Sequence, residues 1–280
     1  MKRKIRIIPR LEIKNNLLIK GINLEGLRVL GEPHDFAQEY YNQGADELYF
    51  VNVVSTLYGT KNNSTYIKKA CKNFFVPMNV GGGIKNIYEI EELLKSGADK
   101  VCINSSAIEN INFIKKASKI FGSSTICSLI EIVKIGNKYY ISKSNGRDLI
   151  DTDPILWAKK LECAGSGELI LLCVNKEGLQ SGFDCEIISK ISKSVYIPTI
   201  ACGGAGSLRD IYDVVKSSEV TGVALSSLLH YNIVNKFNFK NKKIGNTKYL
   251  NGIIKNKKKT TGNIILQIKN FLKSKGYETS

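Results

Sequence analysis

Short apolar runs alternate along this chain with stretches in which apolar residues recur at helical spacing. The runs are rich in Ile and Val and cover residues 5–9, 48–54, 76–80, 100–104, 126–132, 168–174, 197–201 and 221–225. Amphipathic stretches lie between them, for example at residues 35–43, 87–96 and 208–216. Short continuous apolar strands between helices are typical of a parallel sheet that is buried on both faces. The pattern therefore predicts an α/β fold.

The second half of the chain repeats the first at an offset near 121 residues. Val76–Gly83 matches Ile197–Gly204, Gly44–Leu48 matches Gly165–Leu169, Ser105-Ser106 falls on Ser226-Ser227, and Leu11–Ile13 falls on Ile130–Ile132 at an offset of 119. Several matches in the same order indicate a duplicated half. Eight strands in two equal halves predict a closed (β/α)8 TIM barrel, which usually has about 250 residues. An open doubly wound sheet needs no such repeat.

Composition excludes several classes of protein. Apolar residues make up 43% of the 280 residues and charged residues 24%, which allows a packed core and argues against disorder. No run approaches 18 apolar residues, so no membrane span is expected. The basic segment 1–9 has no signal-peptide core or cleavage site. The seven cysteines are scattered, without C-x-x-C spacing, as expected for thiols in a reducing cytoplasm.

The net charge of +16 is concentrated at the C-terminal end of the chain. Residues 231–280 hold twelve lysines and one acid, with the densest stretch at Lys255–Lys259. Aromatic residues there are few and are not spaced for base stacking. A solvated loop followed by a basic last helix explains this charge, and the alternative is a site for RNA or another anionic partner. The pattern does not favour nucleic acid as a partner.

Two glycine-rich loops point to phosphate binding. Gly81–Gly83 follows the third predicted strand, and Gly203–Gly206 follows the seventh. Glycines at strand ends let backbone N–H groups approach an anion closely, and the strands that follow end in Asn104–Ser106 and Ser226-Ser227, whose hydroxyls can complete each site. A single loop of this kind could be only a tight turn. Two related loops predict a substrate with a phosphate at each end.

Two carboxylates occupy equivalent places in the repeat. Glu12 ends the first predicted strand and Glu131 the fifth, so the barrel places them opposite each other at the end where active sites of this fold lie. Such a pair suits general acid and general base catalysis. The alternative is that each pairs with a lysine such as Lys14 or Lys20. Glu177 is either a helper of this pair or a solvated loop acid.

Charged residues also open four of the predicted strands, at the opposite end of the barrel. They are Arg6, Glu47, Lys100 and Glu168. Charges at this end of a barrel are usually stability features, and two acids with two bases could be only that. The chain has two histidines, and it shows no cluster of metal ligands, no nucleotide-binding fingerprint and no redox motif. We therefore expect neither a metal nor a cofactor.

Taken together, these motifs resemble the cyclase subunit of imidazole glycerol phosphate synthase, a family of histidine biosynthesis. The resemblance runs from about residue 4 to residue 235. It rests on Arg6–Pro9, Lys20-Gly21, Gly44–Leu48, Val80–Ile84, Gly97–Val101, Asn104-Ser105, Gly178, Ser181–Asp184 and Gly203–Gly206. The sister family of phosphoribosyl isomerases shares the barrel with two phosphate sites. Those enzymes do not use ammonia, so they have no need of a charged gate for it, and the four charged strand starts favour the cyclase family.

The resemblance implies a two-fold (β/α)8 barrel that forms a heterodimer with a glutaminase subunit on its N-terminal face. Ammonia from that partner passes a charged gate and the barrel interior, then attacks a bisphosphorylated aminoimidazole carboxamide ribonucleotide. The products are imidazole glycerol phosphate and an aminoimidazole carboxamide ribotide. The gate positions are Arg6, Glu47, Lys100 and Glu168, with Asp99 at the glutaminase interface. The substrate and phosphate positions are Gly82, Gly83, Asn104, Ser105, Glu177, Gly178, Gly203, Gly204, Ser226 and Ser227.

The C-terminal end of the barrel, which we call the mouth, departs from the family pattern. The two catalytic aspartates of the family correspond to Glu12 and Glu131, and a cysteine of the family corresponds to Arg10. Asn52 stands where the family has an aspartate, and Asn175–Gly178 replaces an Asp-x-Asp-Gly motif. A glutamate moves the carboxylate by about 1 Å, a displacement that can lower a rate about 10²-fold. These changes suggest a second possibility, a diverged paralogue that channels ammonia to amidinate or amidate a surface sugar precursor.

The family also has a shorter C-terminal end. The resemblance therefore divides the chain into a barrel over residues 1–235, a basic Lys/Asn-rich insertion over 236–263, and a last helix with a tail over 264–280.

Overall fold

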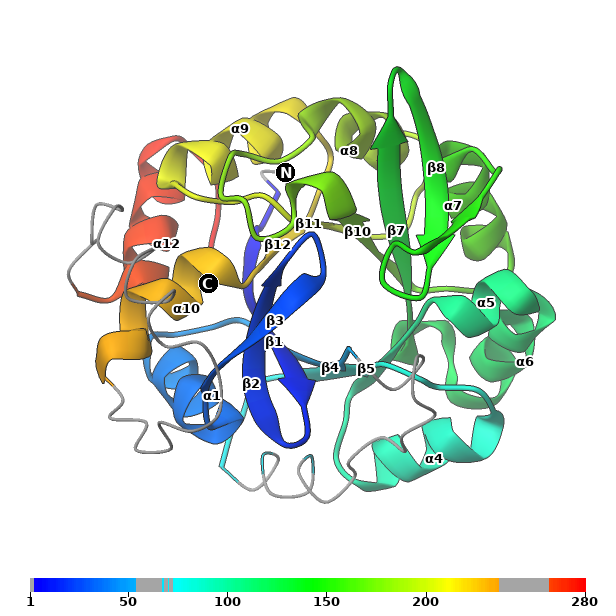
Figure 1. Ribbon diagram of the computed structural model, residues 1–280, viewed down its shortest axis with the longest axis horizontal. Coiled ribbons are helices and arrows are strands. Elements are labelled where there is room, and N and C mark those ends of the chain that lie inside the picture. The colour runs from blue at the N-terminus through cyan, green and yellow to red at the C-terminus, as the bar shows by residue number, and fades with distance from the viewer. Residues whose placement is uncertain (1–2, 54–66, 68–69, 71–72, 237–261) are drawn as a thin grey trace.

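The computed structural model describes residues 3–53, 67, 70, 73–236 and 262–280, and its centre is a closed barrel of eight parallel strands (Figure 1). The barrel strands, in spatial order, are β1 (Arg6–Lys14), β4 (Leu48–Asn52), β5 (Met78–Gly81), β6 (Lys100–Ile103), β7 (Ile126–Ile135), β10 (Glu168–Cys173), β11 (Thr199–Cys202) and β12 (Gly222–Leu225). Strand β12 pairs in parallel with β1 and closes the ring. The predicted (β/α)8 barrel is confirmed.

Helices surround the barrel as an outer ring (Figure 1). They are α1 (Pro33–Asn42), α4 (Ile87–Lys95), α5 (Ser105–Glu109), α6 (Asn112–Phe121), α7 (Pro154–Cys163), α8 (Cys185–Ser192), α9 (Leu208–Ser217), α10 (Ser227–Ile233) and α12 (Ile264–Ser274), with short 3-10 turns η1 (Ser123–Thr125), η2 (Val174–Lys176) and η3 (Val234–Lys236). One apolar cluster fills the layer between strands and helices, and a second cluster fills the barrel interior. Burial of both strand faces explains why the strands are continuous apolar runs.

Two antiparallel hairpins extend the barrel and were not predicted. Strand β1 continues beyond the barrel and pairs with β2 (Leu17–Ile22), which pairs with β3 (Glu25–Gly31). Strand β7 continues in the same way into β8 (Lys138–Lys143) and β9 (Asp148–Ile150). Glu12 and Glu131 were predicted to end their strands, but β1 continues to Lys14 and β7 to Ile135. Both glutamates still pair with barrel strands, Glu12 with Val51 of β4 and Glu131 with Leu172 of β10, so they lie at the predicted C-terminal end of the barrel.

In both Gly-Ala-Asp motifs, the aspartate side chain accepts a hydrogen bond from the backbone at the start of a neighbouring strand. The Asp46 carboxylate accepts the backbone N–H of Ile7 at 2.7 Å, and the Asp99 carboxylate accepts that of Met78 at 2.8 Å. Each aspartate thus satisfies a backbone donor at the start of the neighbouring strand. The residue after each aspartate, Glu47 or Lys100, then belongs to the charged set at this end of the barrel.

The two halves share details of backbone geometry as well as sequence. Asn86 and Ser207 cap α4 and α9, each accepting the N–H three residues on, with nearly the same dihedral angles. The caps of α5 and α10 also agree, with ψ of −82° at both Asn104 and Ser226. Helix α9 is one residue longer than α4. The structural match is therefore Asn104-Ser105 with Ser226-Ser227, which corrects the ungapped alignment by one residue.

The last helix closes the outer ring. Helix α12 buries Ile264, Ile265, Ile268 and Leu272, and the segment after it forms a parallel bridge from Glu278 to Lys4. The predicted insertion over 236–263 lies almost entirely outside the described residues. None of the helices that the structure describes is long and apolar enough to cross a bilayer.

Candidate functional site

Four charged side chains form a buried group at the C-terminal end of the barrel, which we call the mouth quartet: Arg10, Glu12, Lys20 and Glu177. Glu12 accepts from Lys20 Nζ at 2.6 Å and lies 2.6 Å from Arg10 Nη1. Glu177 pairs with the same Lys20 and lies 3.4 Å from Arg10 Nη1. All four are buried. Buried charges persist only when they are paired in this way.

Glu12 is an ionised carboxylate in this environment. Burial alone raises its pKa, but Lys20 and Arg10 outweigh burial and hold the pKa below its ordinary value. Burial lowers the pKa of Lys20, and the carboxylates of Glu12 and Glu177 raise it above its ordinary value. Of the two pairing alternatives for Glu12, Lys20 is the partner found, and Arg10 is a second partner that sequence reasoning did not name.

Glu131 is buried on β7 without a comparable partner. Its carboxyl accepts the backbone N–H of Gly146 at 2.8 Å and a bond from Ser142 Oγ at 3.3 Å. Within the described part of the chain no lysine or arginine lies within ion-pair distance of it. Burial raises the pKa of Glu131 to about 7, against the lowering effect of Gly146 and Ser142. The two repeat-related carboxyls therefore have different environments and different affinities for a proton.

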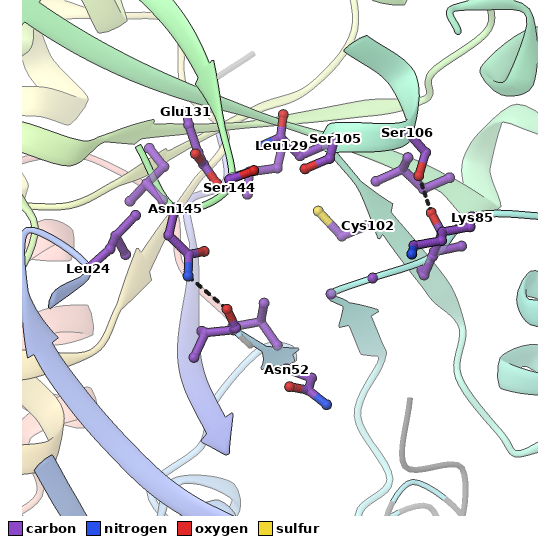
Figure 2. Close-up of a pocket in the computed structure, with 18 of the residues that line it drawn as sticks. Leu24, Asn52, Lys85, Cys102, Ser105, Ser106, Leu129, Glu131, Ser144 and Asn145 are labelled. Atoms are coloured by element: carbon purple, nitrogen blue, oxygen red, sulfur yellow. Dashed lines mark hydrogen bonds between the residues drawn. The ribbon is translucent and has the colours of Figure 1, made fainter. Parts of the chain in front are cut away.

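A cavity of about 220 Å³ opens beside Glu131. Its lining includes Arg10, the glycines Gly82 and Gly83, and Asn104 with Ser105. Figure 2 shows Glu131, Ser105 and Asn145 around this cavity, and the dashed line from Asn145 marks its 2.8 Å bond to the Val53 carbonyl. The first predicted phosphate site and one of the two carboxyls thus share one cavity.

Gly82 is required by the close approach of two strands. It has φ +102°, and a Cβ there would lie 2.2 Å from the Asn52 carbonyl oxygen. A side chain at this position would therefore push apart the strand ends that form the cavity wall.

The second predicted phosphate site lies beside the mouth quartet. A Cβ on Gly203 would lie 3.2 Å from Glu177 Oε2, and one on Gly178 would lie 2.4 Å from the Gly21 carbonyl oxygen. Ser226 Oγ donates to the Arg10 carbonyl at 2.9 Å. Ser227 Oγ is buried and has no partner among the described residues. Neither these serines nor Gly203 and Gly204 belong to the lining of the cavity beside Glu131.

The charged strand starts form a second group of four, the gate quartet: Arg6, Glu47, Lys100 and Glu168. Lys100 donates to Glu47 at 3.0 Å and to Glu168 at 2.9 Å, and Arg6 pairs with Glu47 at 2.9 Å and also with Glu168. Burial lowers the pKa of Lys100, but the two carboxylates raise it above its ordinary value. Asp99 is the residue before Lys100 and is exposed, and its carboxylate accepts the backbone N–H of Met78. Each of the two cations therefore pairs with both carboxylates, so the four side chains are linked to one another at this end of the barrel.

Sequence reasoning missed Arg10 as a site residue, together with the hairpin groups Ser142 and Gly146 that hold Glu131. Arg10 could have been found, because side chains two apart on a strand point to the same side and Arg10 precedes Glu12 by two. The hairpins carried a weaker signal in Asn15-Asn16 and Ser144-Asn145, which adopt positive φ and suit tight turns. Among the described residues no group of His, Cys, Asp or Glu is arranged to hold a metal ion.

The two-fold (β/α)8 barrel has glycine loops and buried carboxyls at equivalent places in its halves, and comparison with known proteins identifies its family. The chain belongs to the histidine biosynthesis protein family, whose sequence model matches residues 6–235. It is similar to imidazole glycerol phosphate synthase subunit HisF of Legionella pneumophila, with 42% identity over 74% of this chain and 98% of that protein. It is also similar to subunit HisF of Prochlorococcus marinus (strain MIT 9515), with 39% identity over 81% of this chain and 89% of that protein. Subunit HisF of Sulfolobus acidocaldarius is 38% identical over 76% of this chain and 86% of its own length. These relatives give no support to the surface-sugar alternative.

Proposed function

We propose that this protein is the cyclase subunit of an imidazole glycerol phosphate synthase. It uses ammonia and a bisphosphorylated aminoimidazole carboxamide ribonucleotide to form imidazole glycerol phosphate and aminoimidazole carboxamide ribotide. Family membership and the names of the relatives support the reaction class. The observation that carries the proposal is the pair of buried carboxyls, Glu12 and Glu131, on equivalent strands of the two halves.

The different environments of the two carboxyls suit the two tasks of a cyclisation that also expels a leaving group. Glu131, with a pKa near 7, is able to donate and accept a proton at neutral pH. Glu12 remains ionised and stabilises positive charge that develops on the nitrogen nucleophile. Both side chains are one methylene longer than the aspartates of the family pattern. Each accepts a hydrogen bond from a hairpin strand, Glu12 from Lys20 on β2 and Glu131 from Ser142 on β8.

The phosphates of the substrate bind at the two ends of the mouth. One site comprises Gly82, Gly83, Asn104 and Ser105, and the other comprises Gly203, Gly204, Ser226 and Ser227 with Gly178 and Glu177 beside it. The buried, unpartnered Ser227 Oγ supplies a donor for the second site. Crystals grown with phosphate should show one anion near Gly83 and Ser105 and another near Gly204 and Ser227. Two empty loops would contradict this assignment.

The decisive experiment is an assay of the purified protein with ammonium salt and the bisphosphorylated ribonucleotide. Imidazole glycerol phosphate should form, and the Glu131→Gln variant should form much less. The double variant Glu12→Asp, Glu131→Asp should not exceed the parent protein, because the present mouth is built around the longer side chains. No product from the parent protein, or a large gain in the double variant, would indicate a different ammonia acceptor.

The glutaminase partner binds at the N-terminal end of the barrel. The gate quartet closes this end, and the exposed aromatics Phe75 and Tyr196 lie at equivalent positions three residues before β5 and β11. Large exposed aromatic side chains are characteristic anchors of protein interfaces. Ammonia produced by the partner then reaches the mouth through the barrel without release as ammonium.

Glutamine-dependent and ammonia-dependent rates separate the roles of the two ends. The variants Lys100→Met, Asp99→Asn and the pair Phe75→Ser with Tyr196→Ser should lower the glutamine-dependent rate, or binding of the glutaminase, more than the ammonia-dependent rate. Leu156→Ser on helix α7 is a matched control for an exposed apolar side chain. Equal losses with both nitrogen sources would show that the gate quartet is only structural.

A further inference from the structure

The charges at the mouth are divided unequally between the two candidate catalytic carboxyls. Glu12 has two cations at 2.6 Å, Lys20 from the hairpin and Arg10 from its own strand. Among the described residues, the groups that bond to Glu131 are neutral ones such as Gly146, Ser142 and Asn104. Because the two glutamates are equivalent in the repeat, the difference comes from the cations placed around one of them. Arg10 is the member of this group that replaces a cysteine of the family pattern.

We infer that Arg10 is a positioning residue that assigns the two carboxyls to different tasks. By completing the mouth quartet, it fixes Glu12 as a permanent anion and leaves Glu131 as the one group that gives and takes up protons. The assignment to a reaction rests on the proposed function, whereas the charge arrangement itself does not depend on the substrate.

The charge balance of the quartet explains why Arg10 is needed. Lys20 alone would face two buried carboxylates, Glu12 and Glu177, which both lie within ion-pair distance of its Nζ. A buried group with one excess negative charge takes up a proton, because burial disfavours the unpaired charge. Arg10, whose Nη1 lies near both carboxylates, supplies the second positive charge. With Arg10 present, the group has two cations for two carboxylates and no excess negative charge.

The other titratable groups around the quartet are neutral across the useful pH range. Burial lowers the pKa of His230 on α10 to about 3, and burial raises the pKa of Cys202 on β11 to about 12. Burial raises the pKa of Tyr49 on β4 well above its ordinary value. Around Glu131, the facing groups are Ser142, Gly146, Asn104 and, at longer range, Arg10. Titration between pH 5 and pH 9 therefore follows the glutamate carboxyls of the mouth and not these three neighbours.

The test follows the carboxyl groups directly, without substrate. Carbon-13 NMR of glutamate-labelled protein, with signals assigned by Glu12→Gln and Glu131→Gln, gives the midpoint of each titration. In the parent protein Glu131 should titrate near pH 7, and Glu12 should not titrate above pH 5. In Arg10→Met the Glu12 midpoint should rise by about 1–3 pH units, the size of shift that a neighbouring arginine produces. Arg10→Lys should restore a low midpoint.

Arg209→Met is the matched control, because Arg209 forms an exposed pair with Asp213 on α9, away from the mouth. It should leave both midpoints unchanged. An unchanged Glu12 midpoint in Arg10→Met, or a larger movement of Glu131 than of Glu12, would overturn the inference. Absence of imidazole glycerol phosphate synthesis would defeat the proposed function but would leave this titration result standing.

Stability measurements keep the inference testable if Arg10→Met folds poorly. In that variant the folded-state pKa of Glu12 lies above its unfolded value, so stability is greatest at low pH and is lost as pH rises through the folded pKa. Relative to the parent protein, the destabilisation of Arg10→Met should therefore be smaller at pH 5 than at pH 8, and Lys20→Met, which also leaves one buried carboxylate in excess, should show the same trend. Equal destabilisation at pH 5 and pH 8 in both variants would overturn the inference.

Discussion

The gate quartet and the mouth quartet are built from the same components at opposite ends of the barrel. Each has two cations and two carboxylates, and each takes one arginine from β1, Arg6 at the gate and Arg10 at the mouth. The two arginines are four residues apart and therefore point to the same side of the strand. In both groups a lysine bridges the two carboxylates, Lys100 in one and Lys20 in the other.

Solvent access distinguishes them. The side chains of Arg6 and Lys100 are 24% and 19% exposed, whereas those of Arg10 and Lys20 are 2% and 1% exposed. A partly exposed cation can exchange its ion pair for hydration at a modest cost in free energy. For a fully buried cation, separation of the pair leaves an unsolvated charge and costs much more. The comparison teaches that two groups built from the same charged side chains differ in solvent access, and that burial decides how readily their ion pairs can separate.

The largest expected effect concerns the carboxyl that belongs to neither quartet. Glu131→Gln keeps the shape and the bond from Ser142 but removes proton exchange, so ammonia-dependent turnover should fall by about 10²–10⁴-fold. Steady-state assays at saturating ammonium measure this, with circular dichroism to verify the fold. Full turnover in the variant would show that Glu131 takes no part in proton transfer.

Removing one cation from the mouth should cost more stability than any comparable change at the gate. Lys20→Met leaves two buried carboxylates with Arg10 alone, and breaking a buried pair in this way typically costs about 3–5 kcal/mol. Denaturant unfolding at pH 8 provides the value. If the loss is under about 1 kcal/mol, the mouth quartet behaves like an exposed pair and the comparison fails.

Glu131 should also make stability depend on pH. Its folded pKa of about 7 lies above the ordinary value of 4.5, so its contribution is present below pH 4.5 and is lost as pH rises through 7. Relative to the parent protein, Glu131→Gln should gain up to about 3 kcal/mol between pH 4.5 and pH 7.5. Parallel unfolding curves at several pH values test this, and a constant difference between the two proteins would refute it.

Lys100→Met at the gate should have the smallest effect on stability. Arg6 remains bonded to both carboxylates, and the lost cation is partly solvated. The cost should therefore lie between the 0–1 kcal/mol typical of exposed pairs and the 3–5 kcal/mol typical of buried ones, near about 1–2 kcal/mol. The same unfolding assay applied to Lys20→Met and Lys100→Met gives the ratio. Equal losses would remove the distinction between the quartets.

The barrel was predictable because its strands are buried on both faces and because the two halves repeat. The positions of Glu12, Glu131 and the glycine loops followed from the same repeat. Arg10 and Glu177 were harder to assign, since pairing within a buried group depends on distances between β1, β2 and the segment after η2 that no sequence spacing fixes. The hairpins were missed because β2 and β3 show no alternation of buried and exposed residues, which is the pattern that predicts an antiparallel strand.

The extra residue of α9 shows where the duplicated fold tolerates change. Despite it, Ile200 pairs with Gly222 as Asn79 pairs with Lys100, so β11 and β12 keep the register of β5 and β6. The insertion was absorbed in the outer layer, where a helix end slides at little cost, while the hydrogen-bonded ladder stayed fixed. This difference in length between the halves thus lies in the outer helical layer. A recombinant barrel assembled from two copies of one half should inherit its strand register from the ladder, whatever helix lengths are chosen.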